Sequence, residues 1–163
     1  MATWNDVIET APEFAADARA LFDAHKHKTI ATLRKDGGPR ISGIELELAG
    51  GEAVFGMMPQ SLKARDIRRD PRVAVHSGSA DPDPENPTAW PGDAKISGRT
   101  VEVADRELAR ALFKAMGAPE EVWESPIFVL DIAEVVVTRV APSAEYLDVL
   151  LWKDGHVTTF RAE

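Results

Sequence analysis

The sequence contains no cysteine among its 163 residues. A disulfide framework, a thiolate metal site and a thiol nucleophile are therefore excluded. It also has no apolar run close to the ~20 residues that a helix needs to span a bilayer, so we expect no membrane partner. The first residues, Met-Ala-Thr-Trp-Asn-Asp, lack the basic start and apolar core of a signal peptide. We therefore expect a cytoplasmic protein.

Several catalytic motifs are missing as well. The sequence has no Gly-x-Ser-x-Gly, Gly-x-Gly-x-x-Gly or Walker element, so a hydrolase elbow and a nucleotide-binding loop have no support. The four histidines, His25, His27, His76 and His156, stand in no His-Glu-x-x-His context. We therefore predict no metal site, and no side chain is singled out as a catalytic acid, base or nucleophile.

The composition is that of a globular protein, with 44% apolar and 28% charged residues, and we expect one domain over residues 1–163. Acidic residues outnumber basic ones by 27 to 19, which gives a net charge of -8. This balance argues against a nucleic-acid partner.

Periodicity predicts helices over residues 1–26, with Pro12 in a first turn. Strands 29–33 and 40–48 follow, joined by Lys35-Asp-Gly-Gly38 as a hairpin turn. In the second strand Ile44, Leu46 and Leu48 share one face, while Gly43, Glu45 and Glu47 share the other, which we expect to be wet. With a strand at 53–58, three consecutive antiparallel strands suggest a meander that closes into a barrel.

The second half of the chain adds a long loop at 77–93 with Trp90, a strand at 94–103 and a helix at 106–116. Gly98 suggests either a bulge or a close backbone approach in that strand. The helix is expected to turn Leu108, Ala111, Leu112 and Ala115 inward. A long β-branched strand at 126–140 and a C-terminal hairpin at 144–163 complete the pattern.

The stretch from Val54 to His76 predicts strand, turn, helix and strand. Ser61 is a good N-cap, and the N–H groups of Leu62, Lys63 and Ala64 would be free at the helix start. Together with the Lys63 ammonium they favour an anion. The window from 60 to 72 carries five cations and two acids, so a solvated helix with ion pairs is the alternative.

The motif Ser61-x-Lys63-x-x-Asp66-Ile67-x-x-Asp70-Pro71-Arg72-Val73 resembles the FMN-binding split-barrel family, the pyridoxamine 5'-phosphate oxidase-like flavoproteins. The block from Thr29 to Ile44 is similar to that family's first hairpin. The resemblance implies a mostly β fold with flanking helices: a six-stranded antiparallel split β-barrel with Greek-key connections. It also implies a homodimer with one FMN in each groove between the subunits, and a small-molecule substrate.

The resemblance also assigns cofactor contacts. Lys63 and Ser61, with Leu62 between them, correspond to positions at the flavin phosphate. The segments that correspond to the ribityl chain and the isoalloxazine are Arg40, Ile41, Ser42 and Gly43, and Phe55, Gly56, Met57 and Met58. Gly43 and Gly56 have no Cβ, so a planar ring can approach the backbone there. We expect Met57 and Met58 on opposite faces, and Trp152 to complete the site from the partner subunit.

The implied activity is that of an FMN-dependent oxidoreductase that transfers hydride through flavin N5 to an unidentified small organic acceptor. The chain ends Thr158-Thr-Phe-Arg-Ala-Glu163, without the arginine-x-tryptophan motif of true pyridoxamine phosphate oxidases, which argues against that reaction. Two alternatives stay open: a deazaflavin-dependent reductase of the same fold, and a non-catalytic flavin- or haem-binding protein. The arginines at 65, 68, 69 and 72 suit the acidic tail of deazaflavin, or are solvated.

Overall fold

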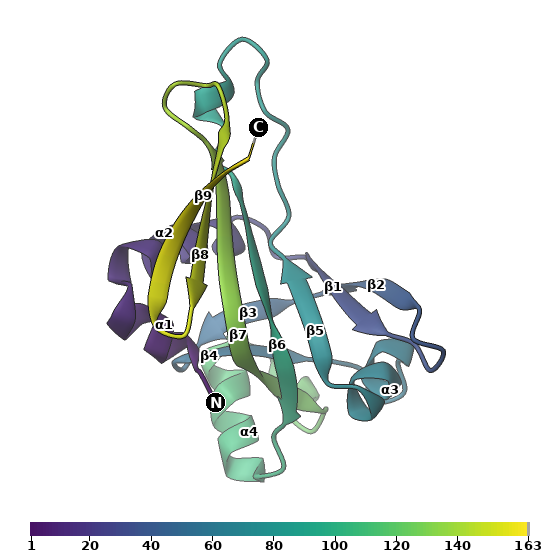
Figure 1. Cartoon of the computed structure of the whole chain (residues 1–163). Helices are drawn as coiled ribbons and strands as arrows, with labels where there is room; N and C mark the ends of the chain where they lie inside the picture. Colours follow the sequence, from purple (N-terminus) through teal and green to yellow (C-terminus); the bar gives the residue numbers. More distant parts are fainter. Residues whose placement is uncertain (163) are drawn as a thin grey trace.

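The computed structural model describes residues 1–162 and contains four α-helices and nine strands among them (Figure 1). The helices are α1 (Trp4–Thr10), α2 (Pro12–Asp23), α3 (Leu62–Arg69) and α4 (Arg106–Ala115). The strands are β1 (Lys28–Leu33), β2 (Pro39–Ile44), β3 (Leu46–Ala49), β4 (Glu52–Gly56), β5 (Arg72–His76), β6 (Asp93–Glu102), β7 (Ile127–Val140), β8 (Leu147–Lys153) and β9 (His156–Ala162). Short 3-10 helices cover Pro87–Ala89 and Glu120–Val122.

All nine strands belong to one antiparallel sheet, in the order β2-β1-β5-β6-β7-β4-β3, with β8 added to β7 and β9 to β8. The 14-residue strand β7 is its centre, because it pairs with β4, β6 and β8. Figure 1 places α1 and α2 on the side of the β8–β9 hairpin, α4 at the foot of β7 and α3 beside β1 and β5. This is the predicted fold class, an antiparallel split barrel with flanking helices, but the predicted count of six strands is wrong.

The predicted three-stranded meander is also wrong. The expected strand 40–48 is interrupted at Glu45, and its second part, β3, pairs with β4 and not with β1. Over the described residues no pairing joins β2 to β3, which lie at the two ends of the sheet path. The alternation of buried side chains nevertheless continues through the break, since Ile44, Leu46 and Leu48 are all buried. Alternation reports which face is buried, but not which strand is the neighbour.

Helix α4 begins at its predicted cap, where the Asp105 carboxylate accepts the N–H groups of Glu107 and Leu108. Its buried face differs from the prediction. Ala109, Leu112 and Phe113 are buried, whereas Leu108 is 51% exposed, and Ala111 and Ala115 are exposed too. Two stripes of helical spacing overlap in this segment, and the stripe that contains the large Phe113 ring is the one buried because it removes more apolar area from water.

Gly98 does mark a bulge, as predicted. The register between β6 and β7 shifts between Ser97 and Gly98, and a Cβ at Gly98 would lie 2.0 Å from the Asp131 carbonyl oxygen. Only glycine allows that approach of the two backbones. The extra residue of the bulge lies in β7, between the residues that pair with β4 and those that pair with β8.

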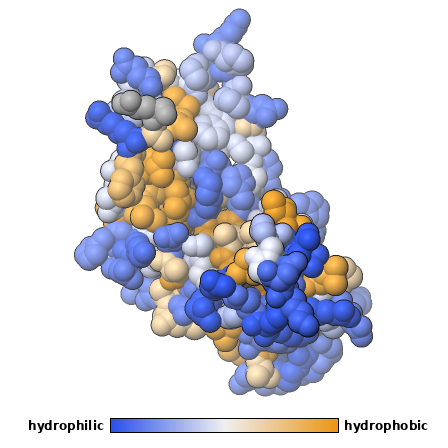
Figure 2. Space-filling model, turned by 45° about the vertical axis from the view of Figure 1, so that its right-hand side comes forward, coloured by the Kyte–Doolittle hydropathy of each residue, from blue (hydrophilic) through white to orange (hydrophobic). Residues whose placement is uncertain are grey.

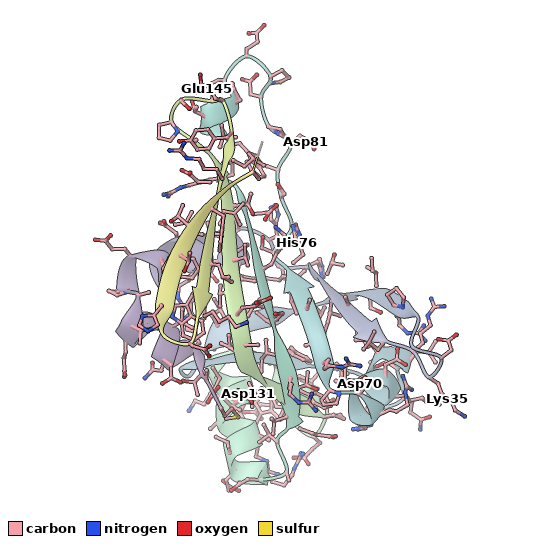
Figure 3. The ribbon with its side chains drawn as sticks, in the orientation of Figure 1. Lys35, Asp70, His76, Asp81, Asp131 and Glu145 are labelled. Carbon is pink, nitrogen blue, oxygen red and sulfur yellow. The ribbon has the colours of Figure 1, made fainter. Side chains whose placement is uncertain are left out.

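The long loop after β5 is tied to itself through Trp90. The indole N–H donates to the carbonyl oxygen of Ala80 at 2.8 Å and to the Ser79 hydroxyl at 3.1 Å. Figure 3 shows Asp81 on this loop and His76 at its root. Within residues 1–162, no helix combines the length and hydropathy needed to cross a membrane.

Candidate functional site

Helix α3 begins at Leu62 and has Ser61 as its N-cap, as predicted. The Ser61 hydroxyl accepts the N–H of Ala64 at 3.3 Å, and the Ser61 carbonyl accepts the N–H of Arg65, which is the first helical bond. The N–H groups of Leu62 and Lys63 therefore stay outside the helical ladder. The helix ends at Asp70, which has extended dihedrals before Pro71.

The Lys63 side chain links α3 to β2. Its ammonium donates a hydrogen bond of 2.5 Å to the carbonyl oxygen of Gly43. Burial lowers the pKa of Lys63 below the ordinary lysine value. A cation that is partly removed from water is a favourable partner for an anion, because the anion replaces the interactions with water that the cation loses on burial.

A pocket of about 660 Å³ lies beside this contact, and its volume is in the range of small-molecule sites, about 300–1,000 Å³. One wall consists of Gly43 on β2, Lys63 on α3, and Gly56, Met57 and Met58 at the end of β4. The opposite wall comes from α4 and the segment after it, with the apolar side chains Phe113, Met116, Pro119 and Val122. The pocket thus joins an apolar wall to a wall that has exposed backbone and the Lys63 ammonium.

The two glycines of this wall differ in their surroundings. A Cβ at Gly43 would meet nothing within 4 Å, so open space lies over the backbone at that point. A Cβ at Gly56 would lie 3.0 Å from the Phe113 ring. Gly43 therefore leaves room for a flat ligand, whereas Gly56 is needed first for the packing of α4.

Five of the twelve predicted cofactor residues line the pocket: Gly43, Gly56, Met57, Met58 and Lys63. Met57 is 6% exposed and Met58 is 73% exposed, so the two thioethers do point to opposite sides. Ser61 and Leu62 lie next to the pocket at the start of α3. The exposed Ile41 and the half-buried Ser42 lie on β2 just before Gly43.

Three predicted residues lie elsewhere. Trp152 is buried in the core of its own chain, where its indole N–H donates to the Thr10 hydroxyl at 2.9 Å. Phe55 is fully buried and stacks on Phe128 with ring centroids 5.8 Å apart. The Arg40 guanidinium turns toward α3 and donates to Asp66 at 2.6 Å. The structure therefore does not bring these three side chains into the pocket.

The arginines of the window from 60 to 72 are mostly paired. Arg68 forms two hydrogen bonds to Glu102, at 2.6 and 2.8 Å, and Arg72 forms two to Asp70, at 2.6 and 2.9 Å. Arg69 contacts Asp66 at 3.0 Å. These pairs match the alternative of a helix with ion pairs for three of the four arginines, and so they weaken the argument for a long acidic cofactor tail.

Sequence reasoning missed the acidic side of the pocket. Glu45 and Glu47 were expected on a wet outer face, but both line the pocket together with Lys26 and His27. The Glu45 carboxylate lies 3.5 Å from the Lys26 ammonium and 3.8 Å from the His27 ring. The signal was present: both acids share a strand face with Gly43, so a ligand over Gly43 implies a site that extends toward them. The apolar wall from α4 had no signal in the sequence.

No group of three or more histidine, aspartate or glutamate side chains in the described part of the chain is placed to hold a metal ion. The pocket therefore offers backbone groups, the half-buried Lys63 ammonium, the exposed Lys26, two carboxylates and an apolar wall. These are the features of a site for an organic ligand with an ionised group, and the fold that carries it is an antiparallel split barrel.

Comparison with known proteins identifies the family. Residues 14–142 match the family described as pyridoxamine 5'-phosphate oxidase, and the chain belongs to that family. No curated protein matches the chain.

Solved structures share the fold at low identity. A pyridoxamine 5'-phosphate oxidase-related, FMN-binding protein from Nostoc punctiforme is 12% identical, with a TM-score of 0.62 over 93% of this chain and 95% of that one. An F420 reductase is 21% identical, with a TM-score of 0.51 over 72% and 94%. A heme-binding protein from Mycobacterium smegmatis is 17% identical, with a TM-score of 0.56 over 90% and 86%. One fold thus serves several cofactors.

Proposed function

We propose that the chain binds FMN in the pocket between β2, the end of β4 and α4, and that it is a flavin-dependent oxidoreductase. The observation that carries this proposal is the contact of the Lys63 ammonium with the Gly43 backbone, at the pocket wall and at the capped start of α3. Membership of the pyridoxamine 5'-phosphate oxidase family supports a flavin-type cofactor.

In this proposal the start of α3 holds the phosphate. The ammonium of Lys63 has three donors, and only one is used by the Gly43 carbonyl, so the others are available to phosphate oxygens. The backbone N–H groups of Leu62 and Lys63 add two donors at the positive end of the helix. Ser61 acts indirectly, because its hydroxyl fixes the first turn.

The open backbone at Gly43 and the thioether of Met58 are placed to hold a flat ring system over β2 and the end of β4. Bound FMN would supply hydride transfer at its N5 atom. The chain would hold the flavin in position and exclude water from it. Phe113, Met116 and Val122 form an apolar wall that leaves space for a small organic acceptor.

We further propose a homodimer in which the partner closes the open side of the pocket. Large apolar side chains are exposed at or near the pocket lining: Met58, which lines the pocket, is 73% exposed, and Ile41, two residues before Gly43 on β2, is 76% exposed. Exposed apolar side chains beside a ligand site are typical of a subunit interface. Light scattering on the purified protein should give twice the mass of the 17.8 kDa chain; a monomer at all concentrations contradicts the shared site.

The family's namesake reaction is not part of the proposal, because no arginine-x-tryptophan sequence occurs in residues 1–163. A deazaflavin cofactor is not favoured either, since Arg68, Arg69 and Arg72 are already engaged by carboxylates.

The test is spectroscopic. Protein loaded with FMN should be yellow, should bleach when NADH or NADPH is added without oxygen, and should regain its colour when a small quinone or nitroaromatic acceptor is added. Two results together would instead indicate a flavin carrier. In the first, bound FMN is not reduced by NADH or NADPH. In the second, FMN reduced with dithionite is not reoxidised by any of the acceptors. Selective binding of deazaflavin over FMN would contradict the cofactor assignment.

A further inference from the structure

A second recess lies on the other side of α3, between that helix and the turn that joins β1 to β2. It is open and has a volume of about 560 Å³. It shares no lining residue with the flavin pocket: Leu62 faces this recess, while the adjacent Lys63 faces the pocket. Figure 3 shows Lys35 at the tip of the β1–β2 turn, beside α3, and Figure 2 shows hydrophilic side chains gathered over this part of the molecule.

The recess is strongly cationic in a chain whose net charge is -8. Five cationic side chains and two carboxylates line it, and the cations are Arg34, Lys35, Arg40, Arg65 and Arg69. A local reversal of charge sign of this size concentrates anions at that point of the surface.

Three of these cations have no carboxylate partner. Among the described residues, Arg34, Lys35 and Arg65 lie within 4.0 Å of no acidic side chain. Several arginines outside the recess are held by carboxylates: Arg68 by Glu102, Arg72 by Asp70, and Arg106 and Arg110 by Glu124. Other cations, such as Arg99 and Arg161, also have no carboxylate partner within residues 1–162, but the recess brings three unpaired cations together at one cavity, where they are available to a ligand.

The floor of the recess is fixed by a buried carboxylate. Asp66 is 4% exposed and accepts hydrogen bonds from Arg40 at 2.6 Å, Arg69 at 3.0 Å and Thr32 at 3.1 Å. Arg69 also donates to the carbonyl of Leu33, which ties α3 to the end of β1. Two guanidinium groups of the recess are thus held in place, whereas Arg34, Lys35 and Arg65 are exposed and have to be ordered when an anion binds.

We propose that this recess is a binding site for a diphosphate group, separate from the flavin pocket. Arg34 and Lys35 reach it from the β1–β2 turn and Arg65 from α3, so two adjacent phosphates can be contacted from both sides. An arginine guanidinium forms bidentate hydrogen bonds to phosphate oxygens. A diphosphate has more of these oxygens, and more negative charge, than a single phosphate or carboxylate. The ligand class is a small molecule that carries a diphosphate, such as a nucleotide.

The test is calorimetric titration with inorganic pyrophosphate at about 0.15 M salt, where long-range surface attraction is screened. It is run on the FMN-saturated protein and on the protein without FMN. We expect one pyrophosphate per chain, with orthophosphate and citrate each bound about tenfold more weakly. Arg65→Gln should weaken pyrophosphate binding about tenfold, which is the effect of losing one charge-assisted contact.

The matched control is Lys114→Gln, which removes an exposed cation from α4, outside both cavities. It should leave the affinity for pyrophosphate within about twofold, because the site is local and screening is strong. Equal losses in the two variants, or equal binding of all three anions, would overturn the proposal in favour of a general surface effect. Release of FMN by pyrophosphate would also overturn it, because the recess would then be the phosphate end of the flavin site. The titration without FMN keeps this test independent of whether FMN binds.

Discussion

Replacing Lys63 by methionine removes the one cation that the flavin pocket places beside open backbone. A hydrogen bond to a charged group contributes about 1.5–3 kcal/mol, so the loss corresponds to roughly a 10- to 100-fold weaker affinity for FMN. The fold should tolerate the change: burial lowers the pKa of Lys63, which means that its charged form is disfavoured in the folded chain, and methionine has a similar length without a charge to bury.

The assay is quenching of flavin fluorescence during titration of the FMN-free protein. Lys114→Met, on the exposed side of α4, is the control for the loss of a positive charge and should keep the affinity of the wild type. The wild type should also lose affinity as the pH rises through the lowered pKa of Lys63, earlier than an ordinary lysine with a pKa of about 10.4 would predict. Unchanged affinity in Lys63→Met, with intact folding, would refute the role of Lys63.

Four further predictions concern single positions. Gly43→Ala should change the free energy of unfolding by less than about 0.5 kcal/mol, because its Cβ meets nothing, but should weaken FMN binding about tenfold in the same titration. Gly98→Ala should cost roughly 3 kcal/mol in urea unfolding, because its Cβ would clash with the Asp131 carbonyl. Asp66→Asn should cost roughly 2 kcal/mol at neutral pH. Burial acts to raise the pKa of Asp66, but its hydrogen bonds lower the pKa overall. The stability that Asp66 contributes is therefore present above about pH 4 and is lost as the pH falls through the lowered pKa. A cost of Asp66→Asn that does not change with pH would contradict the ion pairs. Trp152→Phe should cost about 1–3 kcal/mol and leave FMN binding unchanged; the opposite pattern would place Trp152 at the cofactor.

Local signals in the sequence predicted local structure well. The signals for the two ends of α3, Ser61 at its start and Asp70 before Pro71 at its end, involve only residues close together in the sequence. Both ends of the helix lie where these signals indicate. The same holds for the Asp105 cap and for Gly98, whose missing side chain indicates a bulge or a close backbone approach in a strand. Short-range hydrogen bonding and backbone sterics decide these features, and both can be read from the sequence.

Long-range choices were not accessible in the same way. The apolar alternation of Ile44, Leu46 and Leu48 is real, but it does not say that the backbone changes partner at Glu45. The two overlapping stripes of α4 are equally regular, and only the packing of Phe113 against Gly56 selects one. Trp152 lies in the core because α1 supplies Thr10 as a partner 142 residues away. Each of these depends on contacts between segments that are distant in the sequence.

The site was predicted only in part, because some of its residues are brought together by contacts between distant segments. Lys63, Gly43 and Gly56 come from blocks whose spacing marks the family, and the structure brings them to one pocket. The wall formed by α4 and the segment after it comes from a separate region of the chain, and it lies opposite them only once β7 has placed α4 at the foot of the sheet. The acids Glu45 and Glu47 follow from Gly43 by strand alternation, once that face is known to bind a ligand.

The most direct measurement compares FMN with riboflavin, which has the same ring system and ribityl chain but no phosphate, by calorimetric titration of the FMN-free protein. If the start of α3 and Lys63 hold the phosphate, FMN should bind at least about tenfold more tightly than riboflavin, and the difference should shrink in Lys63→Met. Equal affinity for the two flavins, or no binding of either, would contradict the account.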